Sequence, residues 1–151
     1  MIEIHEQDFQ PLERFPYLWR WNILPPAVRA EIRLLTQPAA LAAYDRGTQF
    51  YSRAGHRPKL FQPVGQLEAA EKDAQQVRQW LERSLPDPAQ RIVVSWGPDT
   101  AVITTAAIFC TYWDDFCYPA SDDADIIPLE EDWIVVYRHE EVLYFGACPV
   151  K

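Results

Sequence analysis

The chain has 151 residues, of which 48% are apolar and 24% are charged, so its composition is that of an ordinary globular protein. A chain of this length fits one domain and can bury a core without the help of disulfides or metal. Its formal net charge of -8 excludes the basic balance on which binding to nucleic acid or to anionic lipid depends.

Proline and aromatic residues dominate the start of the chain, where prolines interrupt a run of large rings. The aromatic residues are Phe9, Phe15, Tyr17, Trp19 and Trp21. Proline at this density disfavours helices and central strands. We therefore expect residues 1–22 to form an irregular arm with one short strand, and we expect its aromatic rings to cover the core.

Two short helices are predicted next. The proline pair that starts at Pro25 favours the first turn of a helix over 26–35. A second helix is predicted over 38–46, and Gly47 follows it where a C-terminal cap would stand. Residues 48–63 are punctuated by glycine and proline and are expected to form a loop.

The strongest helical pattern lies over residues 66–85. Apolar residues recur there at spacings of three and four, which places them in one stripe along a helix. The stripe consists of Leu67, Ala70, Ala74, Val77, Leu81 and Leu85. Pro86 and Pro88 follow and end the helix. We expect the stripe to pack against a sheet.

In the last third of the chain the pattern changes to that of β-strands, with runs rich in Ile, Val, Thr and Phe. Residues 91–96 and 101–109 flank a turn sequence and are predicted to form a hairpin. A second hairpin is predicted from 133–138 and 142–145. A short strand at 124–127 is expected within the acidic stretch between the two hairpins.

These elements predict an α+β fold in which N-terminal helices pack on a C-terminal antiparallel β-meander. We expect one domain over 1–151, with a proline-rich arm and helices in 1–90 and an acidic β-meander in 91–151. Residues 1–90 hold 11 acidic and 11 basic residues, whereas 91–151 hold 11 acidic and 3 basic residues. The whole net charge therefore arises in the C-terminal part. There it would attract cationic surfaces, or it would serve solubility alone.

The chain is expected to be cytoplasmic and to avoid the membrane. Its first residues include neither a basic start nor an apolar run, so they do not resemble a secretory signal. The longest uncharged stretch, 100–113, is too short to span a bilayer. An odd number of cysteines, namely Cys110, Cys117 and Cys148, favours reduced thiols in a reducing compartment.

No cofactor, metal site or catalytic residue is expected from the motifs. The five glycines are too scattered for a phosphate loop or a dinucleotide fingerprint. The three cysteines lack the short paired spacing that zinc ligands use. Asp123 and Asp125 alternate as calcium ligands do, but Ile126 stands where a calcium loop needs glycine.

Aromatic residues and carboxylates alternate in blocks along residues 112–125, which we call the acidic–aromatic segment. Aromatic anchors within a ring of charge are typical of a protein-binding patch. The candidate contact residues are Trp113, Asp114, Asp115, Tyr118, Asp122, Asp123 and Asp125. An alternative arrangement stays open, in which Trp113, Phe116 and Tyr118 fold inward and only the aspartates face water.

The block 113–123, together with Trp133 and the run 137–146, resembles small bacterial proteins of unknown function. Some proteins of that kind are similar in size and charge to the immunity proteins of polymorphic toxin systems. The likeness covers about the last 40% of the chain and consists of a helix-then-meander layout with a Trp-x-x-Phe pattern and an acidic turn. It implies a cytoplasmic protein that neutralises a toxin by covering its active surface.

The sequence thus favours a protein that binds another protein over one that catalyses a reaction. The leading hypothesis is an immunity-type inhibitor whose acidic part docks on the basic surface of a toxin. Two alternatives stay open. One is an enzyme, such as a carboxylate-based hydrolase, that uses the same aspartates. The other is a housekeeping interaction protein that has no toxin as its partner.

Overall fold

The computed structural model describes residues 2–54, 57–60 and 62–147. Its helices, with 3-10 helices marked η, are η1 (Glu6–Asp8), η2 (Leu12–Arg14), η3 (Leu18–Trp21), α1 (Pro26–Arg29), α2 (Gln37–Thr48), η4 (Ala69–Glu71), α3 (Ala74–Ser84), α4 (Ala106–Thr111) and α5 (Trp113–Phe116). Its strands are β1 (Phe9–Gln10), β2 (Arg33–Leu35), β3 (Tyr51–Ala54), β4 (Arg57–Leu60), β5 (Gln62–Glu68), β6 (Arg91–Gly97), β7 (Thr100–Thr105), β8 (Ala124–Pro128), β9 (Trp133–Arg138) and β10 (Val142–Ala147).

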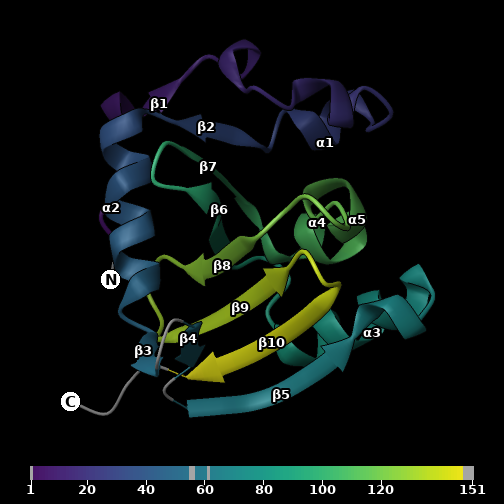
Figure 1. Cartoon of the computed structure of the whole chain (residues 1–151). Coiled ribbons are helices and arrows are strands. Elements are labelled where there is room, and N and C mark those ends of the chain that lie inside the picture. The colour runs from purple at the N-terminus through teal and green to yellow at the C-terminus, as the bar shows by residue number, and fades with distance from the viewer. Residues whose placement is uncertain (1, 55–56, 61, 148–151) are drawn as a thin grey trace.

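Eight of these strands form one antiparallel sheet, in the order β1-β2-β7-β6-β8-β9-β10-β5 (Figure 1). Both predicted hairpins are present, as β6–β7 and β9–β10, and β8 bridges them by pairing with β6 and β9. β3 and β4 form a separate two-stranded sheet. The predicted α+β class is confirmed, with helices from the N-terminal part packed on a sheet built mainly from the C-terminal part.

The sheet also takes strands from the N-terminal part, which the sequence analysis assigned to an arm and helices. β2 pairs with β7 and carries β1 at one edge of the sheet, whereas β5 pairs with β10 at the other edge. The predicted helix over 26–35 therefore ends after α1. The predicted loop over 48–63 is also wrong, because α2 extends to Thr48 and β3, β4 and the start of β5 follow.

The predicted helix over 66–85 is correct only in its second half. Asp73 caps α3, since its side chain accepts a hydrogen bond from the Gln76 amide at 2.8 Å. The Gln76 side chain in turn accepts one from the Asp73 amide at 3.0 Å, which completes a capping box. The predicted helix instead starts in β5, where Leu67 lies opposite Leu143 of β10, and the 3-10 helix η4 connects β5 to the cap. Pairing with β10 thus overrides the helical spacing of the apolar residues.

The second strand of the first hairpin is also shorter than predicted. The strand β7 ends at Thr105, whose side-chain oxygen accepts a hydrogen bond from the Ile108 amide at 3.3 Å. A threonine in that position caps a helix, so the apolar residues after it form α4 instead of extending the strand.

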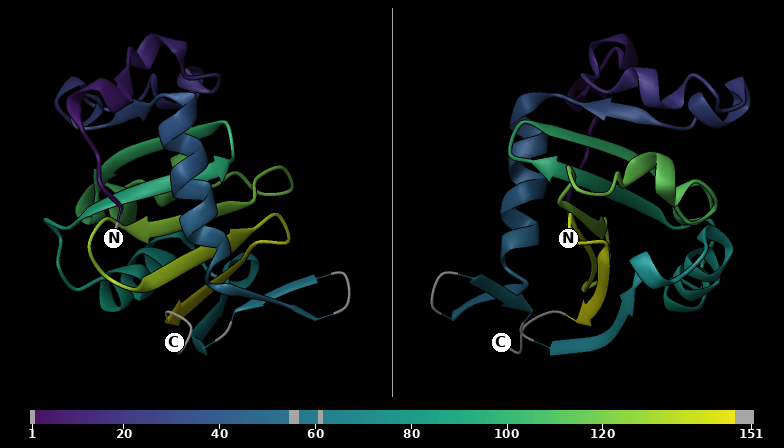
Figure 2. Two further views of the ribbon diagram at one scale, coloured as in Figure 1. Left: turned by 90° about the vertical axis from the view of Figure 1, so that its left-hand side faces the viewer. Right: turned by 45° about the vertical axis from the view of Figure 1, so that its right-hand side comes forward.

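The sheet is covered on both faces (Figure 2). The helix α2 crosses one face, where Ala40, Ala43 and Phe50 pack with Val93 and Ile134. The helices α3, α4 and α5 lie on the other face together with part of the arm. Because β6 is buried on both sides, its residues 92–95 are all buried and show no alternation of apolar and polar side chains.

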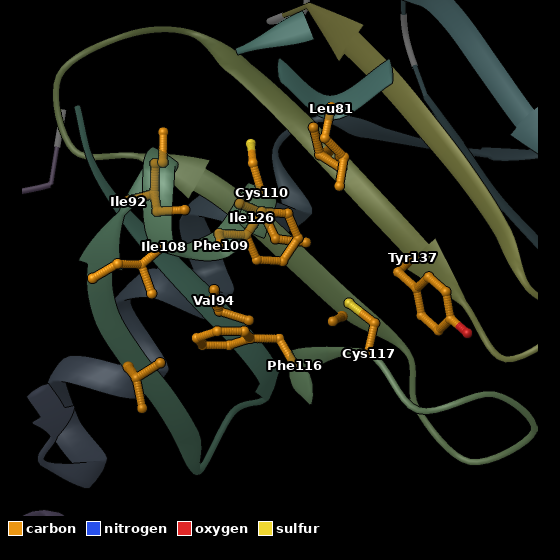
Figure 3. Close-up of a cluster of buried hydrophobic side chains, with 14 of the residues drawn as sticks. Leu81, Ile92, Val94, Ile108, Phe109, Cys110, Phe116, Cys117, Ile126 and Tyr137 are labelled. Atoms are coloured by element: carbon orange, nitrogen blue, oxygen red, sulfur yellow. The ribbon is translucent and has the colours of Figure 1, made fainter. Parts of the chain in front are cut away.

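The larger core lies between the sheet and the α3–α4–α5 side (Figure 3). Its members from the predicted stripe are Val77, Leu81 and Leu85, and Leu67 packs against it from β5. The sheet residues of this core include Ile92, Val94, Val102, Ile126, Val135 and Tyr137. The expected packing of the stripe on the sheet is therefore confirmed for Val77, Leu81 and Leu85.

The structure describes two of the three cysteines, and its helices can be compared with the length that a membrane span requires. Cys110 and Cys117 are buried, unpaired thiols, and burial raises the pKa of Cys110 to about 12, so this thiol stays protonated and unreactive. Cys148 lies outside the described residues. Within the described part of the chain, no helix combines the length and the apolar character that crossing a membrane requires.

Candidate functional site

The structure divides the acidic–aromatic segment among three places. Trp113, Asp114 and Asp115 lie on α5. Tyr118 and Asp122 lie in the following loop and contact the N-terminal arm. Asp123 and Asp125 line a hollow between α2 and the sheet. The predicted contact residues therefore do not form one continuous patch.

On α5, Trp113 is tied to the rest of the chain. Its indole Nε1 donates a hydrogen bond to the carbonyl oxygen of Ala74 at 3.1 Å, and its half-buried ring packs against the larger core. Asp114 is exposed and Asp115 is half-buried. Burial, followed by the charge of Asp114, raises the pKa of Asp115. Trp113 thus joins α5 to the start of α3, whereas Asp114 faces solvent.

Asp122 is buried, so the expectation that it is an exposed contact residue is wrong. Its Oδ2 accepts a hydrogen bond from Arg20 Nη1 at 2.6 Å, and its Oδ1 accepts one from Arg20 Nη2 at 3.1 Å. The side chains of Arg20 and Asp122 are only 5% and 8% exposed. The Tyr118 amide also donates to Asp122 Oδ2 at 2.9 Å. This bidentate ion pair fixes the loop after α5 to the arm.

Aromatic rings surround the guanidinium of Arg20. The Arg20 Cζ lies 3.9 Å from the ring centroid of Tyr118 and 4.5 Å from that of Tyr17. The ring of Trp19 meets the ring of Tyr118 edge to face, with centroids 5.7 Å apart. Tyr118 was predicted to contact a partner directly. Its ring instead packs partly within the fold, because it faces Arg20 and supports Trp19.

Trp19 is the large aromatic residue that reaches solvent here, with 59% of its surface exposed. Trp21, two residues later, is fully buried and stacks on Phe15 with ring centroids 4.4 Å apart. The short 3-10 helix η3 explains the difference, because residues two apart on such a helix point to different sides. Sequence analysis placed both tryptophans over the core, and nothing in the local sequence distinguishes them.

The helix η3 also contacts α5 directly. The indole Nε1 of Trp21 donates a hydrogen bond to the carbonyl oxygen of Asp115 at 3.2 Å. This bond and the Arg20–Asp122 pair hold Trp19 on the same side of the molecule as α5. The exposed aromatic ring therefore belongs to a segment that is fastened to the acidic helix at two points.

The hollow has a volume of about 400 Å³ and lies at one end of α2. Its lining residues are Tyr44 and Thr48 of α2, Tyr51 of β3, Ser95, Trp96 and Gly97 of β6, Pro98, Asp123, Asp125 of β8 and Arg138 of β9. A cavity of this size is within the range of small-ligand sites. Sequence analysis named Asp123 and Asp125 but did not place them in a cavity.

A hydrogen-bonded triad occupies the floor of the hollow. The Tyr51 hydroxyl donates to Asp125 Oδ1 at 2.6 Å, and Arg138 Nη2 donates to the Tyr51 oxygen at 2.9 Å. Arg138 Nη1 lies 3.4 Å from Asp125 Oδ1. Burial raises the pKa of Asp125, although Arg138 acts in the opposite direction. Asp125 is thus a largely buried carboxylate, with a side chain 14% exposed, whose Oδ1 is held by the chain itself.

Asp123 stands at the rim of the hollow and contacts His139. The His139 amide donates to Asp123 Oδ1 at 2.9 Å, and the His139 Nδ1 lies 3.0 Å from the same oxygen. Burial acts to raise the pKa of Asp123, but the two contacts with His139 outweigh it and lower that pKa. The hydrogen bond to Asp123, followed by the charge of Glu140, raises the pKa of His139.

We expect the imidazole of His139 to titrate above its ordinary pKa of 6.5, and we expect the Asp123→Asn variant to bring that pKa back toward 6.5. Proton NMR of the imidazole ring across a pH titration measures both values. Because the folded-state pKa is the higher one, the contact stabilises the fold below pH 6.5, and this stabilisation disappears as pH rises through the folded-state pKa. Identical titration curves for wild type and variant would contradict this assignment.

Two of the hydroxyl groups that line the hollow donate hydrogen bonds to backbone carbonyl oxygens. The Ser95 hydroxyl donates to the Gly97 carbonyl at 3.3 Å, and the Thr48 hydroxyl donates to the Asp45 carbonyl at 2.7 Å. Neither hydroxyl is therefore paired with a base that would activate it. Within the described ranges, no group of three or more His, Cys, Asp or Glu side chains gathers in a way that would hold a metal ion.

No protein-family model, no curated protein and no solved structure matches this chain. The fold and the site define an α+β protein with an exposed tryptophan beside an acidic helix and a carboxylate-lined hollow.

Proposed function

We propose that this protein binds a protein with a basic surface, as an immunity-type inhibitor that covers the active surface of a toxin. The observation that carries the proposal is Trp19, which is 59% exposed although its position is fixed by its neighbours. Exposed tryptophans held in place are the residues most enriched among the energetic centres of protein interfaces. Ile23, which is 80% exposed, adds apolar surface in the same segment.

Fixing Trp19 in advance favours tight binding. Its ring rests on Tyr118, and Tyr118 rests on the buried Arg20–Asp122 pair. A side chain whose rotamer is already restricted loses less conformational entropy when a partner covers it.

The charge around Trp19 determines the kind of partner. Asp114 and Asp115 lie on α5, which η3 contacts, and neither forms an ion pair with a lysine or arginine in the part of the chain that the structure describes. A surface of this kind attracts a cationic partner and accelerates its association.

We expect the Trp19→Ala variant to bind the partner about 30-fold more weakly, since truncation of a central aromatic residue costs about 2 kcal/mol or more. The loss should appear as faster dissociation. Wild-type association should slow with added salt, because salt screens the electrostatic attraction between the two proteins beyond about 8 Å at physiological ionic strength. Binding kinetics against the protein that the wild-type chain captures in its native host measure both effects.

The matched control is Leu41→Ala, which removes another exposed apolar side chain, 48% exposed, from α2. It should bind as wild type does. Equal binding by Trp19→Ala and wild type would refute the interface. The inhibitor role requires in addition that the captured protein be toxic when produced alone and harmless when produced with this chain. A captured protein that is harmless by itself would leave an interaction protein without a toxin.

The alternative of an enzyme would rest on the hollow, which brings Asp123 and Asp125 to one cavity. Carboxylates in a hydrolase need freedom to give and take a proton. Asp125 Oδ1 accepts a hydrogen bond from Tyr51 and is close to Arg138, and Asp123 Oδ1 is held by His139. These contacts orient the two groups as fixed acceptors, which suits the binding of a cation better than proton transfer.

A further inference from the structure

We infer that the hollow is a second contact site, which receives one arginine side chain of the basic partner. The inference rests on the proposed function and adds to it the chemical group that the site recognises. The hollow opens beside Asp123, the rim residue that follows the buried Asp122 in the loop after α5. Asp123 and Asp125 thus link the hollow to the acidic–aromatic segment, whose Tyr118 supports Trp19.

The charges that line the hollow favour a cation. Asp123 and Asp125 contribute two carboxylates against one guanidinium, that of Arg138, which already contacts both Asp125 and Tyr51. In both aspartates the hydrogen bonds within the described part of the chain go to Oδ1. Within the residues that the structure describes, no hydrogen bond goes to either Oδ2 atom, and these two oxygens are the acceptors that we assign to the incoming guanidinium.

The shape of the hollow favours a guanidinium over an ammonium group. Three aromatic side chains, those of Tyr44, Tyr51 and Trp96, line it. A guanidinium is planar, stacks on aromatic faces and donates several hydrogen bonds in one plane, whereas the more strongly hydrated ammonium of lysine resists leaving water. A lining of rings with two carboxylate acceptors matches the first of these groups.

Gly47 gives the carboxylate of Asp125 room against α2. A Cβ atom added at this position would lie 3.3 Å from Asp125 Oδ2, a tighter contact than most side chains tolerate. A glycine in the last turn of α2 weakens that helix, since alanine would favour it. Gly47 is itself buried, so its missing side chain allows the close approach of Asp125 to the helix, and an alanine there would displace the carboxylate that we assign to the arginine.

The test uses N-acetyl-arginine methylamide as the probe and N-acetyl-citrulline methylamide as its uncharged counterpart of nearly equal shape. Heteronuclear NMR of the intact chain follows the Trp96 indole and the Gly97 amide. We expect the arginine compound alone to shift these signals, with saturation in the millimolar range. We also expect the Asp123→Asn variant to bind it about threefold to fivefold more weakly, as loss of a partly exposed ion pair predicts. Equal shifts from both compounds, or none from either, would overturn the inference.

Binding of the captured partner separates this inference from the proposed function. Gly47→Ala and Asp123→Asn should each lower the affinity for the captured partner at least threefold. The NMR spectra of both variants report whether they remain folded. Full partner affinity in both variants would overturn the arginine site while leaving the Trp19 interface intact. Shifts by the arginine compound combined with an unaffected Trp19→Ala complex would instead support the hollow and refute the Trp19 interface.

Discussion

Replacement of Asp122 by alanine is expected to lower the free energy of unfolding by about 3–5 kcal/mol, which is the loss measured when one partner of a buried ion pair is removed. The variant leaves the guanidinium of Arg20 buried without its counter-ion, in a side chain that is only 5% exposed. It also removes the acceptor of the Tyr118 amide. Chemical denaturation followed by circular dichroism measures the change.

The neighbouring residue supplies the control. Asp123→Ala removes the same group one position later, where the side chain is 52% exposed and contacts His139. This variant should lose less than about 1 kcal/mol, as exposed pairs do. A double variant, Arg20→Met with Asp122→Leu, should recover much of the stability because no charge remains buried. A loss below about 1 kcal/mol for Asp122→Ala would show that the ion pair does not support the fold.

This result bears on function as well as on stability. Arg20 lies under the rings of Tyr17 and Tyr118, and Tyr118 supports Trp19. Loss of Asp122 therefore frees the ring that we place at the centre of the partner interface. Charge-reversal experiments that test steering alone belong on Asp114 and Asp115, because replacing Asp122 or Asp125 by lysine would disturb a network within the fold.

Truncation of Leu81 to alanine is expected to destabilise the protein by about 2–5 kcal/mol, as buried leucine truncations do. Leu81 is fully buried on α3 and lies in the core with Phe109, Ile126 and Tyr137 (Figure 3). The deletion removes apolar contact area and leaves a cavity that the packed helices close only in part. Denaturant midpoints for wild type and variant measure the difference.

The same Leu→Ala change on α2 serves as its control. Leu41 is 48% exposed, and its truncation should change the free energy of unfolding by less than about 0.5 kcal/mol. The two variants share the chemistry of the deletion and differ in burial. A similar small effect in both would mean that α3 does not cover the sheet as described.

The sequence by itself determined the elements whose signals are local. The α3 part of the stripe keeps helical spacing behind an Asp73 cap, and the two hairpins alternate apolar runs with turn residues. These patterns depend on neighbours within a few residues, so they predict an α+β fold without knowledge of the whole. The net charge and its concentration in 91–151 likewise follow from composition.

Tertiary structure alone decided which of these residues are exposed and which are buried. Arg20 and Asp122 are 102 positions apart, and only the folded chain brings them together and buries a carboxylate that the sequence places in a polar loop. β5 pairs with β10 across more than 70 positions, and that pairing overrides its helical spacing. Trp19 and Trp21 have the same chemistry, yet one is exposed and the other buried. The hollow is assembled from α2, β3, β6, β8 and β9, and contacts between distant segments have no signature in local sequence.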